Sequence, residues 1–121
     1  MRLTWEVTAG LPGLLVNRPV FDLAGRLLGI PDALDLEAAT TLEYDGAEHL
    51  LPLNQLADRE RDQRFAAHGL TVLRITKEDF GTDSIDALVA RMREAHDRGL
   101  KRDPDDDRWT LTPPPGWTMP Q

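Results

Sequence analysis

The spacing of hydrophobic residues along the chain is typical of β-strands in some segments and of α-helices in others. Each such segment predicts one element. In the N-terminal half, short apolar runs cover 20–23 and 27–30 with a tight turn between them, which predicts a β-hairpin. The second run can continue past Pro31 as far as Leu34, with the proline forcing an edge position or a bulge. Residues 40–45 predict a third strand, so these strands should form an antiparallel meander.

The period becomes helical in the second half of the chain. Residues 54–68 are dense in helix formers but have only a thin apolar face. Residues 85–98 carry apolar side chains at the spacings of a single helical stripe, which predicts an amphipathic helix. Thr82 or Asp83 is the expected N-cap, and Gly99 is expected to end this helix.

The order of the elements predicts the fold class. Residues 1–9 fit a helical turn as well as a strand, and 70–75 is an apolar run typical of a buried strand between the two helices. A strand-helix-strand step from residue 40 to 75 implies a parallel crossover and therefore a mixed sheet. The expected order is α-β-β-β-α-β-α, an α/β domain over residues 1–99.

Residues 100–121 differ in composition from the rest of the chain. They contain five of the nine prolines and two of the three tryptophans, with three prolines in succession. Two indole side chains favour a C-terminal tail that packs back on the domain. The alternative is a disordered end.

Composition narrows the class of partner. The 121 residues suit one core plus a tail, and 14 Lys and Arg against 21 Asp and Glu give a formal net charge of -7. This balance disfavours non-specific binding to nucleic acid or anionic membranes but is compatible with a local basic groove.

Cysteine is absent, which excludes disulfides and Cys-ligated zinc. No apolar run approaches the roughly 20 residues of a membrane span and no signal peptide opens the chain, so we expect a cytoplasmic protein without a membrane partner.

Four polar residues gather on the predicted strands. Glu43 and Asp45 stand at i and i+2 and leave the same face, Asp32 ends the neighbouring strand, and His49 follows shortly after. Converging carboxylates repel one another unless a hard cation neutralises them, which favours an Mg²⁺ or Mn²⁺ site at Asp32, Glu43 and Asp45. His49 is a candidate ligand or proton carrier. The alternative is that these acids are solvated or cap strand ends.

Arginines on the first predicted helix have two interpretations. Asp58 and Arg61 are spaced as an i,i+3 surface ion pair. Alternatively Arg59, Arg61 and Arg64 form, with Arg74, a local basic strip that binds phosphate.

Four short motifs follow one another along the predicted framework. They are Gly29-Ile30-Pro31-Asp32, Glu43-Tyr44-Asp45-Gly46-x-x-His49, Asp58-x-x-Arg61 and GLTVLRIT from Gly69 to Thr76. In this order the chain resembles uncharacterised bacterial domains related to very-short-patch-repair endonucleases, which belong to the PD-(D/E)XK, or restriction-endonuclease-like, superfamily. The resemblance covers about residues 19–80.

The resemblance implies a restriction-endonuclease-like αβββαβ core whose mixed sheet is flanked by helices and carries the metal site on its edge. Asp32 falls at the family's first catalytic aspartate, Glu43 at the acidic position of the second motif, and His49 at the histidine that follows. Asp45 stands where the superfamily usually has lysine, as is normal for this branch. Arg61 is then a substitute cation.

The implied activity is Mg²⁺- or Mn²⁺-dependent hydrolysis of DNA phosphodiester bonds, a hydrolase reaction in which Arg61 and Arg74 contact the DNA phosphate. Family members also carry a glutamate on a helix upstream of the core, and Glu6 does not occupy that position. The resemblance therefore implies a further N-terminal region, helical or DNA-binding, that this chain lacks.

Two other functions stand beside the nuclease. One is a catalytically silent nuclease fold that serves as a binding or regulatory module in a longer protein, which the acidic charge and the missing superfamily lysine favour. The other, by family analogy alone, is the effector half of a toxin-antitoxin or phage-defence protein. The sequence does not determine the DNA target or the oligomeric state.

Overall fold

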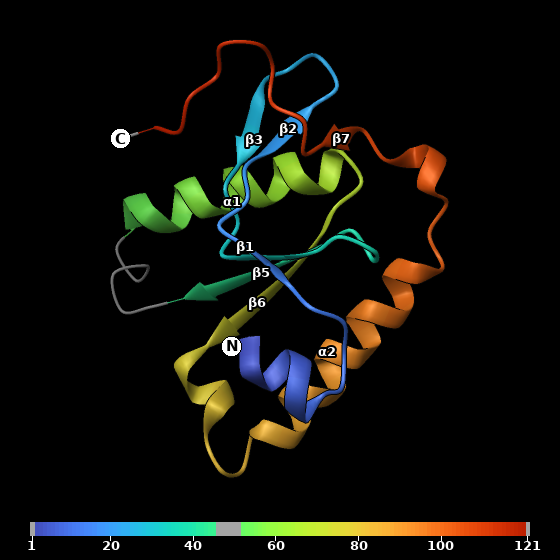
Figure 1. Cartoon of the computed structure of the whole chain (residues 1–121). Helices are drawn as coiled ribbons and strands as arrows, with labels where there is room; N and C mark the ends of the chain where they lie inside the picture. The colour runs from blue at the N-terminus through green and yellow to red at the C-terminus, as the bar shows by residue number, and fades with distance from the viewer. Residues whose placement is uncertain (1, 46–51, 121) are drawn as a thin grey trace.

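The computed structural model describes residues 2–45 and 52–120, and of residues 52–54 it describes the backbone only. The protein is a mixed α/β structure in which helices cover both faces of a mixed sheet and a smaller sheet lies beyond one of these helices (Figure 1). The expected α/β class with a mixed sheet is therefore confirmed. No helix in the described part of the chain is long and apolar enough to cross a bilayer.

The main sheet has four strands in the order β1 (Leu15–Val16), β4 (Ala33–Asp35), β5 (Thr40–Asp45) and β6 (Thr71–Thr76). The pairs β1–β4 and β4–β5 are antiparallel, whereas β5 and β6 are parallel. The helix α1 (Pro52–Ala67) connects β5 to β6. The strand-helix-strand crossover predicted from the sequence is therefore confirmed.

The predicted meander is wrong in one respect. The hairpin forms, as β2 (Val20–Asp22) and β3 (Leu27–Gly29), but it belongs to a separate three-stranded sheet with β7 (Trp109–Thr110). The strand at 40–45 pairs instead with β4. The chain leaves one sheet and enters the other around Pro31, which has no N–H to donate and interrupts the ladder.

The N-terminal segment is helical and includes the short π-helix η1 (Thr4–Thr8). The amphipathic helix forms as α2 (Ile85–Leu100), but its N-cap residue is Ser84 rather than Thr82 or Asp83. Gly99 does not end it.

Gly99 lies inside α2 because of packing. A Cβ atom on Gly99 would overlap the carbonyl oxygen of Ala38, so the residue lets the helix approach the turn between β4 and β5. A glycine that follows an apolar helical stripe can mark the end of the helix or a point where the helix packs closely against another segment, and the sequence pattern is the same in both cases. Only the packing distinguishes them.

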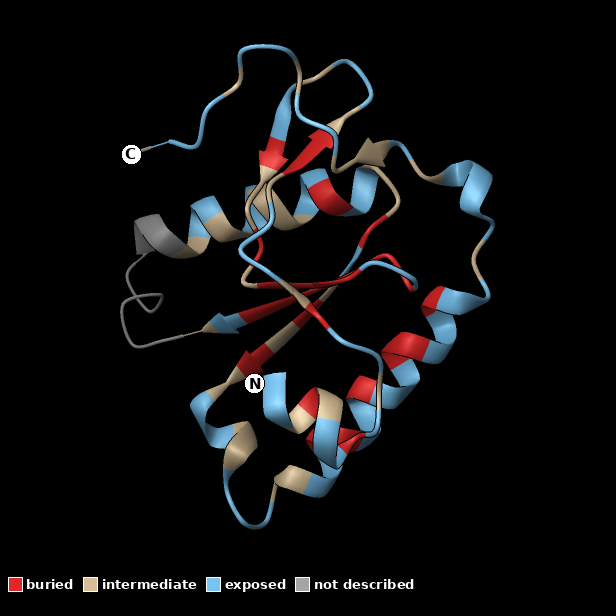
Figure 2. Ribbon diagram, viewed as in Figure 1, coloured by how far each residue is buried: buried red, intermediate tan, exposed pale blue. Residues whose placement is uncertain are grey.

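The apolar core forms one cluster on each face of the main sheet, and buried residues follow its strands (Figure 2). The larger cluster joins the sheet to α2 and η1, and its members include Trp5, Leu42, Ile75, Leu88 and Met92. The smaller cluster joins the sheet to the end of α1 and to the hairpin, with Val20, Leu28, Leu34, Phe65 and Leu70.

The C-terminal segment lies against the hairpin. It passes through the 3₁₀-helix η4 (Pro104–Asp106) and pairs with β2 through β7. The ring of Trp117 then meets Phe21 edge to face at a centroid distance of 5.0 Å. Such a contact between aromatic rings stabilises the packing of the segment on the small sheet.

Candidate functional site

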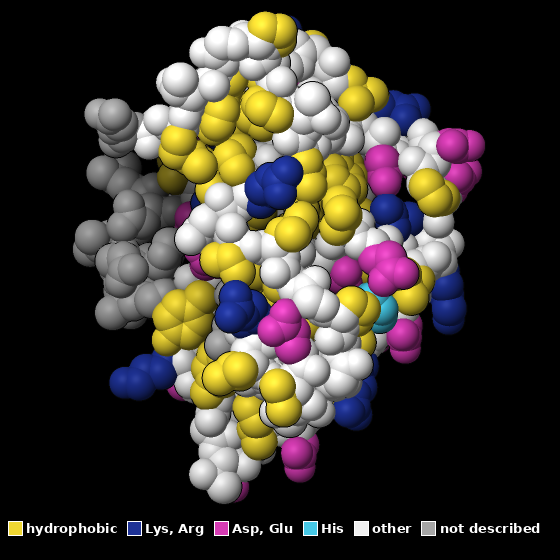
Figure 3. Space-filling model, viewed as in Figure 1, with side chains coloured by type: hydrophobic (Ala, Val, Ile, Leu, Met, Phe, Trp, Pro, Cys, Tyr) yellow, Lys and Arg dark blue, Asp and Glu magenta, His cyan; other side chains and the backbone are white. Residues whose placement is uncertain are grey.

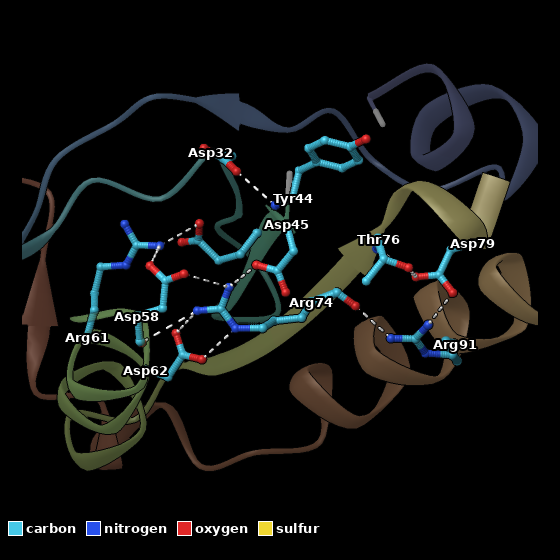
Figure 4. A network of polar contacts seen from close by, with 11 residues as sticks. Asp32, Tyr44, Asp45, Asp58, Arg61, Asp62, Arg74, Thr76, Asp79 and Arg91 are labelled. Atoms are coloured by element: carbon cyan, nitrogen blue, oxygen red, sulfur yellow. Dashed lines mark hydrogen bonds and ion pairs between the residues drawn. The ribbon is translucent and has the colours of Figure 1, made fainter. Parts of the chain in front are cut away.

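Three of the predicted acidic residues come together where β4 begins and β5 ends. Glu43 and Asp45 point toward α1, since residues two apart on a strand share a face. The antiparallel pairing of Ala33 with Leu42 brings Asp32 beside Glu43. Asp32 Oδ2 accepts a hydrogen bond of 2.8 Å from the backbone N–H of Tyr44 (Figure 4). The hairpin geometry of β4 and β5 therefore builds this cluster.

Arg74 enters the same region from β6, in register with Glu43. Its guanidinium donates to Asp45 Oδ1 at 2.6 Å and to the two carboxylate oxygens of Asp62 at 2.7 and 2.8 Å. The carboxylate of Asp58 lies 3.9 Å away. Burial lowers the pKa of Arg74, but the hydrogen bonds and charges of Asp62, Asp45 and Asp58 outweigh it and raise that pKa. Arg74 is therefore a permanent cation among three aspartates.

Glu43 is the most deeply buried member of the cluster, with 2% of its surface exposed. Its Oε2 accepts from Arg61 Nη2 at 2.9 Å, while Oε1 has no hydrogen-bond partner among the described residues. Arg61 Nε is likewise buried without an acceptor. Burial raises the pKa of Glu43 to about 7, although the charge of Arg61 acts in the opposite direction. Buried polar atoms are nearly always paired, so this ion pair is unsaturated on both sides.

Gly29 sets the position of Arg61. A Cβ atom on Gly29 would lie 2.9 Å from Arg61 Cδ and 2.8 Å from Phe65 Cζ, closer than such atoms approach. The absence of a side chain at Gly29 therefore lets α1 lie close to the hairpin strand β3, with Arg61 also reaching Glu43 on the main sheet.

The described structure thus brings Asp32, Glu43 and Asp45 to one side of the sheet. It holds Glu43 and Asp45 to Arg61 and Arg74 respectively. Within residues 2–45 and 52–120, no three His, Asp or Glu side chains are gathered as the ligands of a single ion. His49 lies outside the described residues.

The arginines of the predicted basic strip have separate partners. Arg61 lies 3.9 Å from Asp58, so the predicted i,i+3 pair is present, but its shorter bond is to Glu43. Arg64 donates to the carbonyl oxygen of Leu28 at 3.2 Å and Arg59 is exposed. On the face shown in Figure 3, basic and acidic side chains are interspersed.

Asp62 belongs to the cluster but is not among the residues predicted from the sequence. A signal for it exists in the helical spacing. Asp58, Arg61, Asp62 and Phe65 stand at i, i+3, i+4 and i+7, and Phe65 is fully buried. The face of α1 that buries Phe65 therefore also turns Asp58, Arg61 and Asp62 toward the sheet.

Comparisons with known proteins return no relative. No protein-family model matches the chain, and neither a search of curated proteins nor a search of solved structures finds a match. Function is therefore inferred from the fold and from the cluster of Asp32, Glu43, Asp45, Arg61 and Arg74.

Proposed function

We propose that the chain is a restriction-endonuclease-like domain that hydrolyses phosphodiester bonds in DNA with Mg²⁺ or Mn²⁺ held at Asp32, Glu43 and Asp45. The observation that carries the proposal is the buried Oε1 of Glu43, which has no hydrogen-bond partner in the described part of the chain and belongs to a residue on the strand beside Asp32. An unpaired carboxylate oxygen in a buried acidic cluster is the donor that a hard divalent cation takes.

The order of elements supports the same proposal. With the β2–β3 hairpin and β7 set aside, η1, β1, β4, β5, α1 and β6 follow one another as helix, three strands, helix and strand. All four strands belong to one mixed sheet, and the last is parallel to its neighbour. This order supports the αβββαβ core that the resemblance implies, if the hairpin is an insertion between its first two strands.

The three acidic residues would have different roles at the metal site. Asp32 and Glu43 would hold the metal, and Asp45 would add a ligand or orient a water molecule. A bound divalent ion lowers the pKa of its water and fixes the phosphate. His49, which follows β5 in the sequence, is the candidate for proton transfer.

Arg61 and Arg74 would bind the phosphate. Guanidinium groups form bidentate hydrogen bonds with phosphate oxygens and stabilise the charge that develops on them. Both arginines are about a quarter exposed, at 24% and 26% of their side chains, so solvent and a ligand reach them from outside.

A catalytically silent module is the second candidate, with a binding or regulatory role in a longer protein such as a toxin-antitoxin or defence system. It is favoured by the pairing of Glu43 with Arg61 and of Asp45 with Arg74, which already neutralises two of the three carboxylates. In this case the first pair only attaches α1 to the sheet, and the second only joins β5 to β6.

A calorimetric titration with Mn²⁺ separates the two candidates. The nuclease proposal expects saturable binding by the wild type and its loss in Asp32→Ala. The variant should be about as stable as the wild type, since among the described residues the Asp32 side chain makes one hydrogen bond, accepted from the exposed backbone N–H of Tyr44. Asp97→Ala, on the exposed side of α2, is the matched control and should bind as the wild type does.

Two results would contradict the nuclease proposal. One is the absence of saturable binding in every protein. The other is equal binding by the wild type and Asp32→Ala, which would place the metal elsewhere.

A further inference from the structure

We propose that Arg61 and Arg74 form an arginine latch on the carboxylates, and that the phosphodiester backbone of nucleic acid opens it. Divalent metal and nucleic acid would then bind cooperatively. This inference rests on the proposed metal site and adds its regulation.

The first part of the latch is a direct competition at Asp45. Arg74 Nη1 donates to Asp45 Oδ1 at 2.6 Å, so a metal ion at Asp45 meets the positive guanidinium on the same carboxylate. Arg74 is held in place by its bidentate bond to Asp62. Charge-assisted bonds of this kind are strong, so a metal ion alone binds at Asp45 against a competing cation.

The second part is the unsaturated pair of Glu43 and Arg61. Glu43 is almost fully buried and cannot turn to solvent, whereas 24% of the Arg61 side chain is exposed. Among the residues that the structure describes, the pair leaves one acceptor, Glu43 Oε1, and one donor, Arg61 Nε–H, without partners. A cation completes the glutamate and a phosphate oxygen completes the arginine. When the pair separates, the arginine is the partner that moves outward, because the glutamate is buried.

Nucleic acid is the ligand that this exchange favours. A phosphodiester oxygen replaces a carboxylate as the partner of each arginine without a change in charge, and the freed carboxylates gain a divalent ion. The net charge of -7 repels polyanions in general, so phosphate contacts depend on the few arginines that are released locally. Linkage requires that metal tightens nucleic-acid binding by the same factor as nucleic acid tightens metal binding.

The test is a calorimetric Mn²⁺ titration of the full chain, alone and with a short DNA duplex whose integrity is checked by gel afterwards. The duplex should tighten the Mn²⁺ affinity of the wild type about tenfold, which corresponds to one charge-assisted hydrogen bond. A duplex with an uncharged methylphosphonate backbone should have no effect.

The variants assign the effect to the latch. Arg74→Gln should bind Mn²⁺ about tenfold more tightly than the wild type without DNA, and DNA should add little. Arg61→Gln should behave in the same direction and serves as the second variant if Arg74→Gln fails to fold. Arg91→Gln is the matched control, because Arg91 belongs to the same network but bonds to the carbonyl of Arg74 and to Asp79 (Figure 4).

The outcomes separate the latch from the proposed function. The latch is overturned if both arginine variants bind Mn²⁺ no more tightly than the wild type, or if DNA leaves wild-type affinity unchanged. The metal site itself still stands in those cases, provided that Asp32→Ala abolishes binding. Absence of Mn²⁺ binding in every protein, with and without DNA, overturns the proposed function together with the latch.

Discussion

The two faces of the β5–β6 pair are opposite in character. Toward α2 the strands present Leu42 and Ile75, both fully buried in the larger apolar cluster. Toward α1 the same strands present Glu43, Asp45 and Arg74. Glu43 and Arg74 form ion pairs with the helix, and Asp45 pairs with Arg74 between the strands. One pair of strands therefore holds one helix by apolar contacts and the other by charge.

This contrast indicates that the apolar face, toward α2, contributes more to stability than the charged face toward α1. Burial of apolar side chains is the main favourable term in folding, whereas desolvation cancels much of what a buried ion pair contributes. A continuous apolar interface would hold α1 at least as well, and at its far end Phe65 does pack in this way. Stability alone is therefore a weak explanation of the charged end, and this supports the proposed metal site there.

The largest effect that the comparison predicts is on the apolar face. Leu88→Ala removes a side chain that is 1% exposed in the larger cluster, and should lower the free energy of unfolding by about 2–5 kcal/mol. Urea denaturation measures the loss, and Mn²⁺ affinity should not change. Leu100→Ala, on the same helix but exposed, is the control and should have a small effect. A loss below about 1 kcal/mol for Leu88→Ala would show that this face is not the core.

The sequence predicts the apolar face well because periodicity is local. The stripe of α2 and the strands at 40–45 and 70–75 follow from spacing alone. The position of the hairpin does not, because nothing in the spacing tells on which side of Pro31 one sheet ends and the next begins. The prediction that Gly99 ends α2 is wrong for a similar reason. Its close contact with Ala38 joins residues far apart in sequence, so the local pattern does not reveal it.

The charged face is predictable only in part. The two-residue spacing of Glu43 and Asp45, and the hairpin position of Asp32, place the acids together. The pairing of Glu43 with Arg61 depends on where α1 packs, and α1 lies close to β3 because Gly29 has no side chain. The pairing of Asp45 with Arg74 depends on the register of β5 and β6. Contacts of this kind join residues far apart in sequence, so the local pattern of charges does not reveal them.

A smaller effect tests the burial of charge at Glu43. Burial raises its pKa from 4.5 to about 7, so the folded state holds this proton more tightly than the unfolded state. The protonated Glu43 therefore adds to the free energy of unfolding. This contribution, on the order of 3 kcal/mol in total, is fully present below about pH 4.5 and is lost as the pH rises through about 7. Glu43→Gln should remove this pH dependence.

Urea denaturation of both proteins between about pH 5 and pH 8 measures the difference. The free energy of unfolding of Glu43→Gln, relative to the wild type, should increase with pH. Glu37→Gln, at an exposed glutamate, should follow the wild-type curve. Parallel curves for Glu43→Gln and the wild type would mean that Glu43 is charged throughout, held so by Arg61.

The smallest effect comes from an ion pair outside the comparison. Arg98 and Glu94 form an i,i+4 pair at 3.3 Å on α2, with 66% and 71% of their side chains exposed. Arg98→Gln should cost about 0.3 kcal/mol in urea denaturation, because water and salt screen such pairs, and should leave Mn²⁺ affinity unchanged. A loss above about 1 kcal/mol would show that exposed pairs already stabilise this protein strongly. The network of Arg74 would then need no role beyond attaching α1. A negligible loss would mean that an exposed pair such as Arg98–Glu94 adds little stability. Arg74 differs from Arg98 because it lies among the carboxylates of the proposed metal site.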